Sequence, residues 1–252
     1  MKRLLLLTCL STQLAFGQRT DSTATYALPD KSRFRLGLLY EIGVTLTSTR
    51  LPNFRAFLRS NQIQPDFHLN QLISLGFGLR YDRFKFMGLV ASSLSFSSTP
   101  PNNDLTSRVP VLRHRGIGTL SGLLGYDLLN SRNRRLFLNA GIGGIGTEYS
   151  IYQPTGQAVP FAQILQFNPP VSVPSLTLTN TFWDVNVEYS QREKRKQSVQ
   201  NVVRLGYRRG TRPQAWQSDA YRLTDAITDR ISQVYVQGTF YFSTNYQNRT
   251  GR

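Results

Sequence analysis

Residues 35–46 read Arg-Leu-Gly-Leu-Leu-Tyr-Glu-Ile-Gly-Val-Thr-Leu, and this stretch decides the fold. Its even positions are all apolar, whereas its odd positions after 35 mix glycine, leucine, glutamate and threonine. Because successive side chains of a β-strand point to opposite faces, this order gives one apolar face and one mixed face. A helix would spread the same apolar residues all round its cylinder. The stretch therefore predicts a β-strand.

The same alternation recurs seven more times along the chain, at residues 71–81, 84–96, 116–128, 136–147, 177–189, 199–207 and 231–242. Short connections at 82–83, 130–134 and 191–198 alternate with long ones at 47–70, 97–115, 148–175 and 208–230. Membrane-spanning barrels show this asymmetry, with short periplasmic turns, longer outer loops and an even number of strands. The pattern predicts an all-β fold, an eight-stranded antiparallel up-and-down transmembrane β-barrel with long outer loops.

The mixed faces of the predicted strands carry the charged residues. We expect five of them to point into the barrel: Glu41, Arg80, Asp184, Glu188 and Arg204. Eight strands leave an interior just wide enough for side chains to fill, and an unpaired charge there is costly. These residues therefore predict a paired polar plug that closes the lumen. The alternative is a narrow channel for ions or small solutes.

Aromatic residues gather near the ends of the predicted strands. The set is Tyr81, Phe84, Phe96, Tyr126, Tyr189, Tyr207 and Phe242. Their place at strand ends favours membrane-interface girdles. The alternative is that they are ordinary strand-forming residues.

The first residues are typical of a secretory signal peptide. Lys2 and Arg3 precede a short apolar run, and small residues before position 18 favour cleavage after Gly17. We expect a signal peptide at 1–17, a periplasmic tail at 18–32, the barrel at 33–243 and a C-terminal tail at 244–252. Cys9 raises the alternative of a lipid-anchored N-terminus. Cleavage at 17 leaves no cysteine, which excludes disulfide and thiolate chemistry from the mature chain.

The chain is strongly basic, with a formal net charge of +16. For an exported protein this charge favours outer-membrane lipid and lipopolysaccharide as partners over nucleic acid. The alternative is that the arginines are solvated charges of turns and loops. We expect the outer membrane of a Gram-negative bacterium as the location.

Chemistry-bearing residues are sparse. The two histidines, His68 and His114, have only Asp66 as a nearby carboxylate in sequence, which is too little for a metal site. A lipid-modifying serine enzyme would need His114 beside one of the serines of the third strand, namely Ser92, Ser93 and Ser95. No carboxylate is placed to complete it. We therefore assign no catalytic, cofactor-binding or metal residues, and keep the lipid-modifying enzyme as a third hypothesis behind the channel.

The long connections hold the candidate recognition surfaces. Residues 51–64 and 213–230 have apolar spacing that permits short amphipathic helices. Residues 153–174 contain five prolines, which favour an extended or turn-rich loop. Such loops either bind a partner or cap the barrel.

The chain resembles the small outer-membrane β-barrel family, especially its PorT-like group. The resemblance covers roughly residues 33–243 and is carried by the glycine-spaced segments 116–118, 125–127 and 136–146 and by the final strand Tyr235–Phe242. It implies that a terminal aromatic, here Phe242, is read by the barrel assembly machinery. It implies no common activity. The leading hypothesis is a non-enzymatic barrel that is structural or binds a partner through its extracellular loops.

Overall fold

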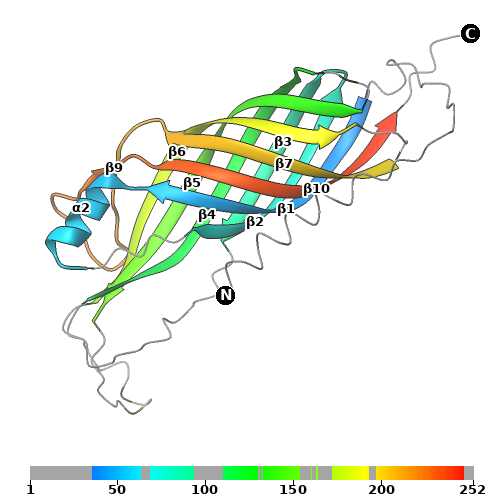
Figure 1. The fold of residues 1–252 in the computed structure, drawn as a ribbon. Helices are drawn as coiled ribbons and strands as arrows, with labels where there is room; N and C mark the ends of the chain where they lie inside the picture. The colour runs from blue at the N-terminus through cyan, green and yellow to red at the C-terminus, as the bar shows by residue number, and fades with distance from the viewer. Residues whose placement is uncertain are drawn as a thin grey trace, which may run out of the picture. The chain divides into compact units, whose positions relative to one another are not determined.

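Eight strands close into one antiparallel barrel, which confirms the predicted fold (Figure 1). The computed structural model describes residues 36–63, 69–93, 110–129, 131, 133–153, 160, 163, 172–192 and 197–246. The barrel strands are β1 (Leu36–Arg50), β2 (Asn70–Tyr81), β3 (Phe84–Ser93), β4 (Val111–Asp127), β5 (Arg134–Tyr152), β6 (Ser172–Gln191), β7 (Gln197–Gly210) and β10 (Ser232–Tyr246).

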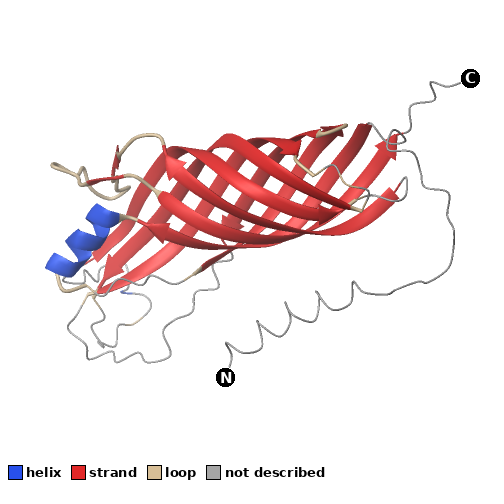
Figure 2. Cartoon of the chain, turned by 45° about the horizontal axis from the view of Figure 1, so that its top comes forward, coloured by secondary structure: helices blue, strands red, loops and turns tan. Residues whose placement is uncertain are grey.

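The two ends of the barrel differ. The turn end holds the short β2–β3, β4–β5 and β6–β7 connections. The loop end holds helix α2 (Pro52–Ser60) and the ribbon of β8 (Gln214–Ala215) and β9 (Thr228–Asp229), as Figure 2 shows. No helix of the described segments is long and apolar enough to cross a membrane.

The register of the strands fixes the tilt of the barrel. A row of register partners that starts on β1 at Leu46 crosses all seven of the other barrel strands in turn. It returns to β1 at Leu36, ten residues away. With about 3.3 Å per residue and about 4.7 Å between strands, this offset tilts eight strands by about 41°. Eight strands at this tilt enclose an interior just wide enough for side chains to fill.

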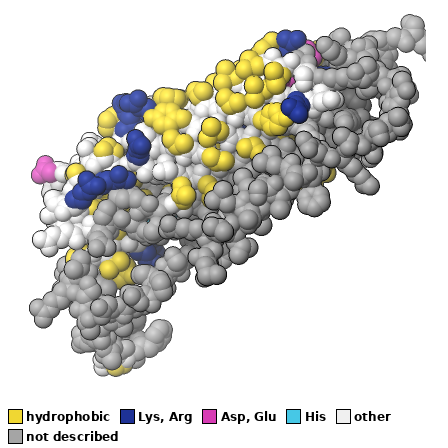
Figure 3. All heavy atoms as spheres, in the orientation of Figure 1, with side chains coloured by type: hydrophobic (Ala, Val, Ile, Leu, Met, Phe, Trp, Pro, Cys, Tyr) yellow, Lys and Arg dark blue, Asp and Glu magenta, His cyan; other side chains and the backbone are white. Residues whose placement is uncertain are grey.

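The outer face of the wall is mainly apolar up to a boundary near the loop end (Figure 3), with Asn201 of β7 as a polar exception. The last outward apolar residues before it are Leu46, Ile73, Val90, Leu120, Ile142, Trp183, Tyr207 and Val234. The next outward residue on every strand is polar or glycine: Ser48, Gln71, Ser92, Gly118, Gly144, Thr181, Arg209 and Ser232. From each strand to the next this boundary rises by zero or two register positions, so it forms a level ring around the barrel.

Several strands are longer than their sequence pattern predicts. β5 continues to Tyr152 and β6 begins at Ser172, both inside the segment 148–175 assigned to a loop. β10 continues to Tyr246, so residues 244–246 are strand and not tail. Beyond the boundary the outward residues are mostly glycine, serine and threonine, so hydrophobic alternation fades while backbone pairing continues. The segments 1–17 and 18–32 lie outside the described residues.

A single apolar cluster joins the inner wall to α2. Leu51, Phe54 and Leu58 of the helix segment pack with inward residues of β4, β5 and β6. The Phe54 ring stacks on Trp216 at 4.3 Å and lies 5.3 Å from Tyr149. The spacing of apolar residues in 51–64 thus corresponds to a short helix that caps the loop end.

The segment 213–230, whose apolar spacing also permits a short helix, does not form one. The segment makes β8 and β9 instead, and Gln217 forms a bridge with Thr177 through two backbone hydrogen bonds of 2.8 and 2.9 Å. Asp225 adopts a positive φ of 55°, which a helix does not accept. Pairing with the edge of β6 therefore takes the place of a helix.

Candidate functional site

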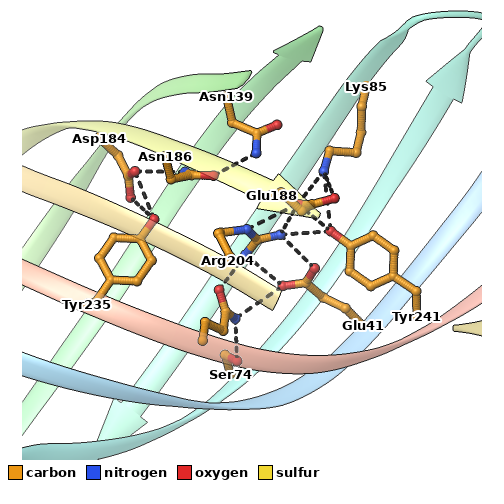
Figure 4. Close-up of polar contacts among 11 residues, drawn as sticks. Glu41, Ser74, Lys85, Asn139, Asp184, Asn186, Glu188, Arg204, Tyr235 and Tyr241 are labelled. Atoms are coloured by element: carbon orange, nitrogen blue, oxygen red, sulfur yellow. Dashed lines mark hydrogen bonds and ion pairs between the residues drawn. The ribbon is translucent and has the colours of Figure 1, made fainter. Parts of the chain in front are cut away.

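The centre of the barrel is occupied by the buried guanidinium of Arg204. It donates to Glu41 Oε2 at 3.1 Å and to Glu188 Oε2 at 2.8 Å, and all three side chains are buried (Figure 4). Glu41 lies on β1, Glu188 on β6 and Arg204 on β7, so the three residues come together across the lumen. An arginine between two carboxylates satisfies both acids with a planar set of donors.

Four further residues complete this cluster, which we call the central network. The Lys85 ammonium on β3 donates to Glu188, and the Tyr241 hydroxyl on β10 donates to Glu188 at 3.0 Å. The Arg204 guanidinium also donates to the Gln237 side chain, whose amide donates to Ser74 at 2.7 Å. The central network therefore bridges the lumen in several directions.

A second polar cluster lies nearer the loop end and centres on Asp184. Its carboxylate accepts from Arg208 at 2.7 Å, from Tyr235 at 2.9 Å and from Asn186 at 2.8 Å. Asn139 donates to Asn186 at 2.6 Å, and the Arg208 guanidinium lies 4.2 Å from the Tyr235 ring centroid. This carboxylate is fully buried and held by three donors.

The charges of these two clusters cancel. Three cations, Lys85, Arg204 and Arg208, face three carboxylates, Glu41, Asp184 and Glu188. Nearer the turn end Arg135 pairs with Asp127 at 3.0 Å, and Arg80 donates to Asn245 at 2.8 Å. Because buried charges are tolerated only when paired, this balance is what an interior filled with side chains requires.

Apolar side chains also fill the interior, both beside the central network and nearer the loop end. Toward the loop end lies the cluster that reaches α2. A smaller cluster of inward residues consists of Leu39, Met87, Leu89, Leu123, Val202 and Tyr241. Inward glycines make room between the large side chains. A Cβ at Gly76 would lie 2.4 Å from Glu41 Cγ, and one at Gly206 would lie 2.4 Å from the Tyr235 ring.

The structure places all five interior residues named from the sequence inside the barrel. It brings Glu41, Glu188 and Arg204 together, whereas Asp184 belongs to the second cluster and Arg80 lies near the turn end. The sequence analysis missed Lys85, Arg208, Tyr235 and Tyr241. Lys85 and both tyrosines occupy alternate positions of predicted strands, which was a usable signal. Arg208 was missed because its strand was ended at residue 207.

The aromatic residues named from the sequence lie on the outer face where they are described. Tyr81, Phe84 and Tyr126 are exposed neighbours on β2, β3 and β4 near the turn end, with Phe84 and Tyr126 centroids 5.2 Å apart. Tyr189 and Phe242 are exposed on β6 and β10. Tyr207 lies at the loop-end boundary instead, 5.5 Å from Trp183. Phe96 lies outside the described residues.

The described serines of the enzyme hypothesis lie beside Gly118 and Ile117 of β4, whereas His114 lies three or more residues away along that strand. Ser92 pairs in register with Gly118, and the Ser93 hydroxyl accepts from the amide of Ile117 at 2.9 Å. His114 lies against Tyr149 with ring centroids 5.0 Å apart. His68, Asp66 and Ser95 lie outside the described residues. Within the described segments, no three His, Cys, Asp or Glu side chains are grouped to hold a metal ion.

A shallow depression of about 410 Å³ lies on the wall beyond the boundary. Small residues of β3 to β6 form it, among them Ser92, Gly118, Gly146 and Thr179, which share one register row. The exposed pair of Arg115 and Glu148, 3.1 Å apart, borders it. His114 is not among its lining residues.

Asp229 holds the cap in place. Its carboxylate accepts from the amides of Asn53 and Phe54 at 2.9 and 2.7 Å, at the start of α2. It also accepts from the Trp216 indole at 3.1 Å. The N-cap residue Leu51 makes no side-chain hydrogen bond to the first amides of α2. The buried Asp229 side chain therefore accepts from these amides in its place.

We expect Asp229→Ala to loosen α2 without opening the barrel, because three donors lose their acceptor. Leaving buried donors unpaired costs about 1–3 kcal/mol, so the amides of Asn53 and Phe54 should exchange with solvent at least about tenfold faster. Hydrogen exchange of the folded protein measures this. Asp219→Ala, at an exposed acid of the same segment, is the matched control and should leave both rates unchanged.

Comparisons with known proteins return similarity of structure only. No family model and no curated protein matches the chain. A major outer membrane protein from Thermus thermophilus aligns at TM-score 0.46 and 8% identity, over 82% of this chain and 99% of that one. Neisserial surface protein A aligns at 0.43 and 7%, over 80% and 95%. Ail, the attachment invasion locus protein of Yersinia pestis, aligns at 0.41 and 9%, over 82% and 99%. The assignment of the fold rests on the strand pairing itself.

Proposed function

We propose that this protein is an outer-membrane β-barrel of a Gram-negative bacterium, and that its packed interior makes it a rigid, non-conducting support for its loop end. The observation that carries this proposal is the distribution of polarity. The outer face is mainly apolar below a level boundary, while the interior holds the paired charges. A barrel in water would have its charges outside. In a bilayer the apolar wall meets lipid, and the closed sheet pairs its backbone groups.

The height of the apolar band supports the same placement. On β1 the outward apolar residues run from Leu36 to Leu46. At a tilt of about 41° these ten steps climb about 25 Å, the height of the apolar band of membrane barrels. On β6 the run from Trp183 to Tyr189 climbs about 15 Å by the same arithmetic. The band is therefore thinner on that side of the barrel.

The proposed export route and partners follow from this placement. A signal peptide at 1–17 directs the chain across the inner membrane, and Phe242 near the end of β10 serves as the aromatic that the assembly machinery reads. Tyr81, Phe84, Tyr126, Tyr189 and Phe242 lie at a membrane interface. The PorT-like group is our hypothesis for the family. The loop end, with its capped helix, is the surface that a protein partner would meet, and no catalytic role is proposed.

Heat-modifiability tests the membrane barrel. The full chain is folded in detergent, and boiled and unboiled samples are compared on a denaturing gel. The proposal expects an unboiled band that runs faster, together with β-rich circular dichroism. A chain that is soluble without detergent and gives one unshifted band would contradict it.

Conductance separates the sealed barrel from the channel hypothesis. We expect the folded full chain to show no large, stable conductance in planar bilayers, because the central network and the apolar layers occupy the lumen. Current is recorded from bilayers in which insertion is verified by gel shift of the same preparation. Stable, reproducible current steps would contradict a sealed interior and favour the channel.

A further inference from the structure

We infer that Arg50, Ser232 and Arg209 form a binding site for the phosphate of a lipid headgroup on the outer wall. The inference rests on the proposed membrane placement and names a lipid partner for the wall. The three residues lie on adjacent strands β1, β10 and β7. Arg50 pairs in register with Ser232, and Ser232 pairs with Arg209. All three point outward, and both arginines are exposed.

The spacing suits one phosphate between two guanidinium groups. Arg50 and Arg209 are two strands apart, so their Cα atoms are separated by about 10 Å. Ser232 between them has a short side chain that is only partly covered. Two long, flexible arginine side chains can converge over it, and their planar donors match phosphate oxygens. The Tyr207 hydroxyl lies 3.5 Å from the Ser232 hydroxyl and can hold it in place.

The level of the row indicates a lipid headgroup. Ser232 and Arg209 are the first outward residues beyond the boundary on their strands, and Arg50 is the second on β1. Directly below them the wall is apolar, at Val234 and Tyr207. A headgroup phosphate lies at this depth when the acyl chains lie against the apolar band.

Two aromatic residues, Trp183 and Tyr207, lie beside Arg209 on the outer wall. Trp183 pairs in register with Arg209, and its ring lies 5.5 Å from Tyr207 at an interplanar angle of 69°. Such rings are favoured at the level where headgroups meet acyl chains. The row thus places two arginines beside two aromatic rings, an arrangement that suits an anionic lipid at the headgroup level.

The two arginines are available for a ligand. Among the ion pairs of the described chain, none involves Arg50 or Arg209. The inward neighbour Arg208 is paired with Asp184 inside the barrel. A protein carboxylate could also bind two arginines, but it would have to approach at the edge of the apolar band. The depth of the row favours the lipid.

Trp183 serves as a reporter for the test. The chain has two tryptophans, and Trp216 is buried in the cap, away from the wall. The full chain is folded into two sets of phosphatidylcholine vesicles, each with the same mole fraction of a lipid that carries bromine on its acyl chains. The brominated lipid is phosphatidic acid in one set and phosphatidylcholine in the other. Quenching of fluorescence reports which lipid lies beside Trp183. Two basic residues near the surface give an expected preference for phosphatidic acid of about tenfold or more.

Matched variants make the test specific. The double variant Arg50→Gln with Arg209→Gln should lose the preference. The double variant Arg59→Gln with Arg134→Gln removes the same charge from exposed positions on α2 and at the turn end, and should keep it. Excess inorganic phosphate, against chloride at equal ionic strength, should not abolish the preference.

The other outcomes would refute the lipid site, its assignment to a lipid or the proposed function. Equal quenching by both lipids, or equal loss in both double variants, would refute the lipid site while leaving the barrel in place. Loss of the preference in dissolved phosphate would reduce the row to a general anion site and refute the lipid assignment. A chain that shows no gel shift in either vesicle would refute the proposed function itself.

Discussion

Replacing Arg204 with methionine is expected to lower the free energy of unfolding by roughly 3–5 kcal/mol, the largest effect of any single change in the interior. The variant leaves Glu41 and Glu188 buried on opposite sides of the lumen without the guanidinium that binds both. In the variant, Lys85 still forms an ion pair with Glu188. Among the described contacts, Lys85 makes none with Glu41. Urea titration of the folded barrel, followed by the shift between folded and unfolded gel bands, measures the loss.

Two further variants show whether the loss comes from the broken pair. Arg209→Met removes an outward arginine of the same strand and, in neutral detergent, should change stability by less than about 0.5 kcal/mol. Glu41→Gln added to Arg204→Met removes one of the two stranded charges and should restore part of the loss. Equal losses from Arg204→Met and Arg209→Met would show that the central network does not hold the barrel together.

Gly143→Val and Gly144→Val should differ sharply although the two residues are adjacent. A Cβ at Gly143 would lie 2.3 Å from the Leu120 carbonyl oxygen and 2.6 Å from the Phe182 ring, so the backbone of β4 would have to move. We expect the free energy of unfolding to fall by about 3 kcal/mol, the upper range for overpacking. The same urea titration measures it.

Gly144 supplies the matched control. It points outward, and nothing lies within 4 Å of its ideal Cβ. Gly144→Val should therefore be neutral within about 0.5 kcal/mol, since valine also favours the strand. If both variants lost stability equally, the glycines of β5 would matter for their backbone freedom and not for the space they leave.

The strands were predictable because their signal is local. Hydrophobic alternation within ten residues identifies a strand and its two faces, and it placed Glu41, Glu188 and Arg204 on the inward face. Their mutual contacts were not predictable in detail. Arg204 and Glu41 are 163 residues apart, and they meet only because the register of every intervening strand brings them to one level.

The missed residues show where the local signal ends. Tyr235 and Tyr241 are inward residues whose hydroxyls donate to Asp184 and Glu188. The sequence around a tyrosine in a strand does not indicate the hydrogen-bond partner of its hydroxyl. Arg208 lies beyond the apolar outward residues of β7, where alternation no longer marks a strand. The segment 213–230 carried helical spacing, yet pairing with β6 decided its conformation.

The ten-residue offset on which the barrel closes constrains how this sequence can change in length. Because the offset is even, each inward residue meets an inward partner after a full circuit, and the alternation of the wall is continuous. A single-residue insertion within β1 would invert the faces of the rest of that strand and send Leu46 inward. The same insertion in an outer loop would leave every strand unchanged. Related barrels should therefore differ in length mainly between strands, and pairs of residues should be gained or lost together within them.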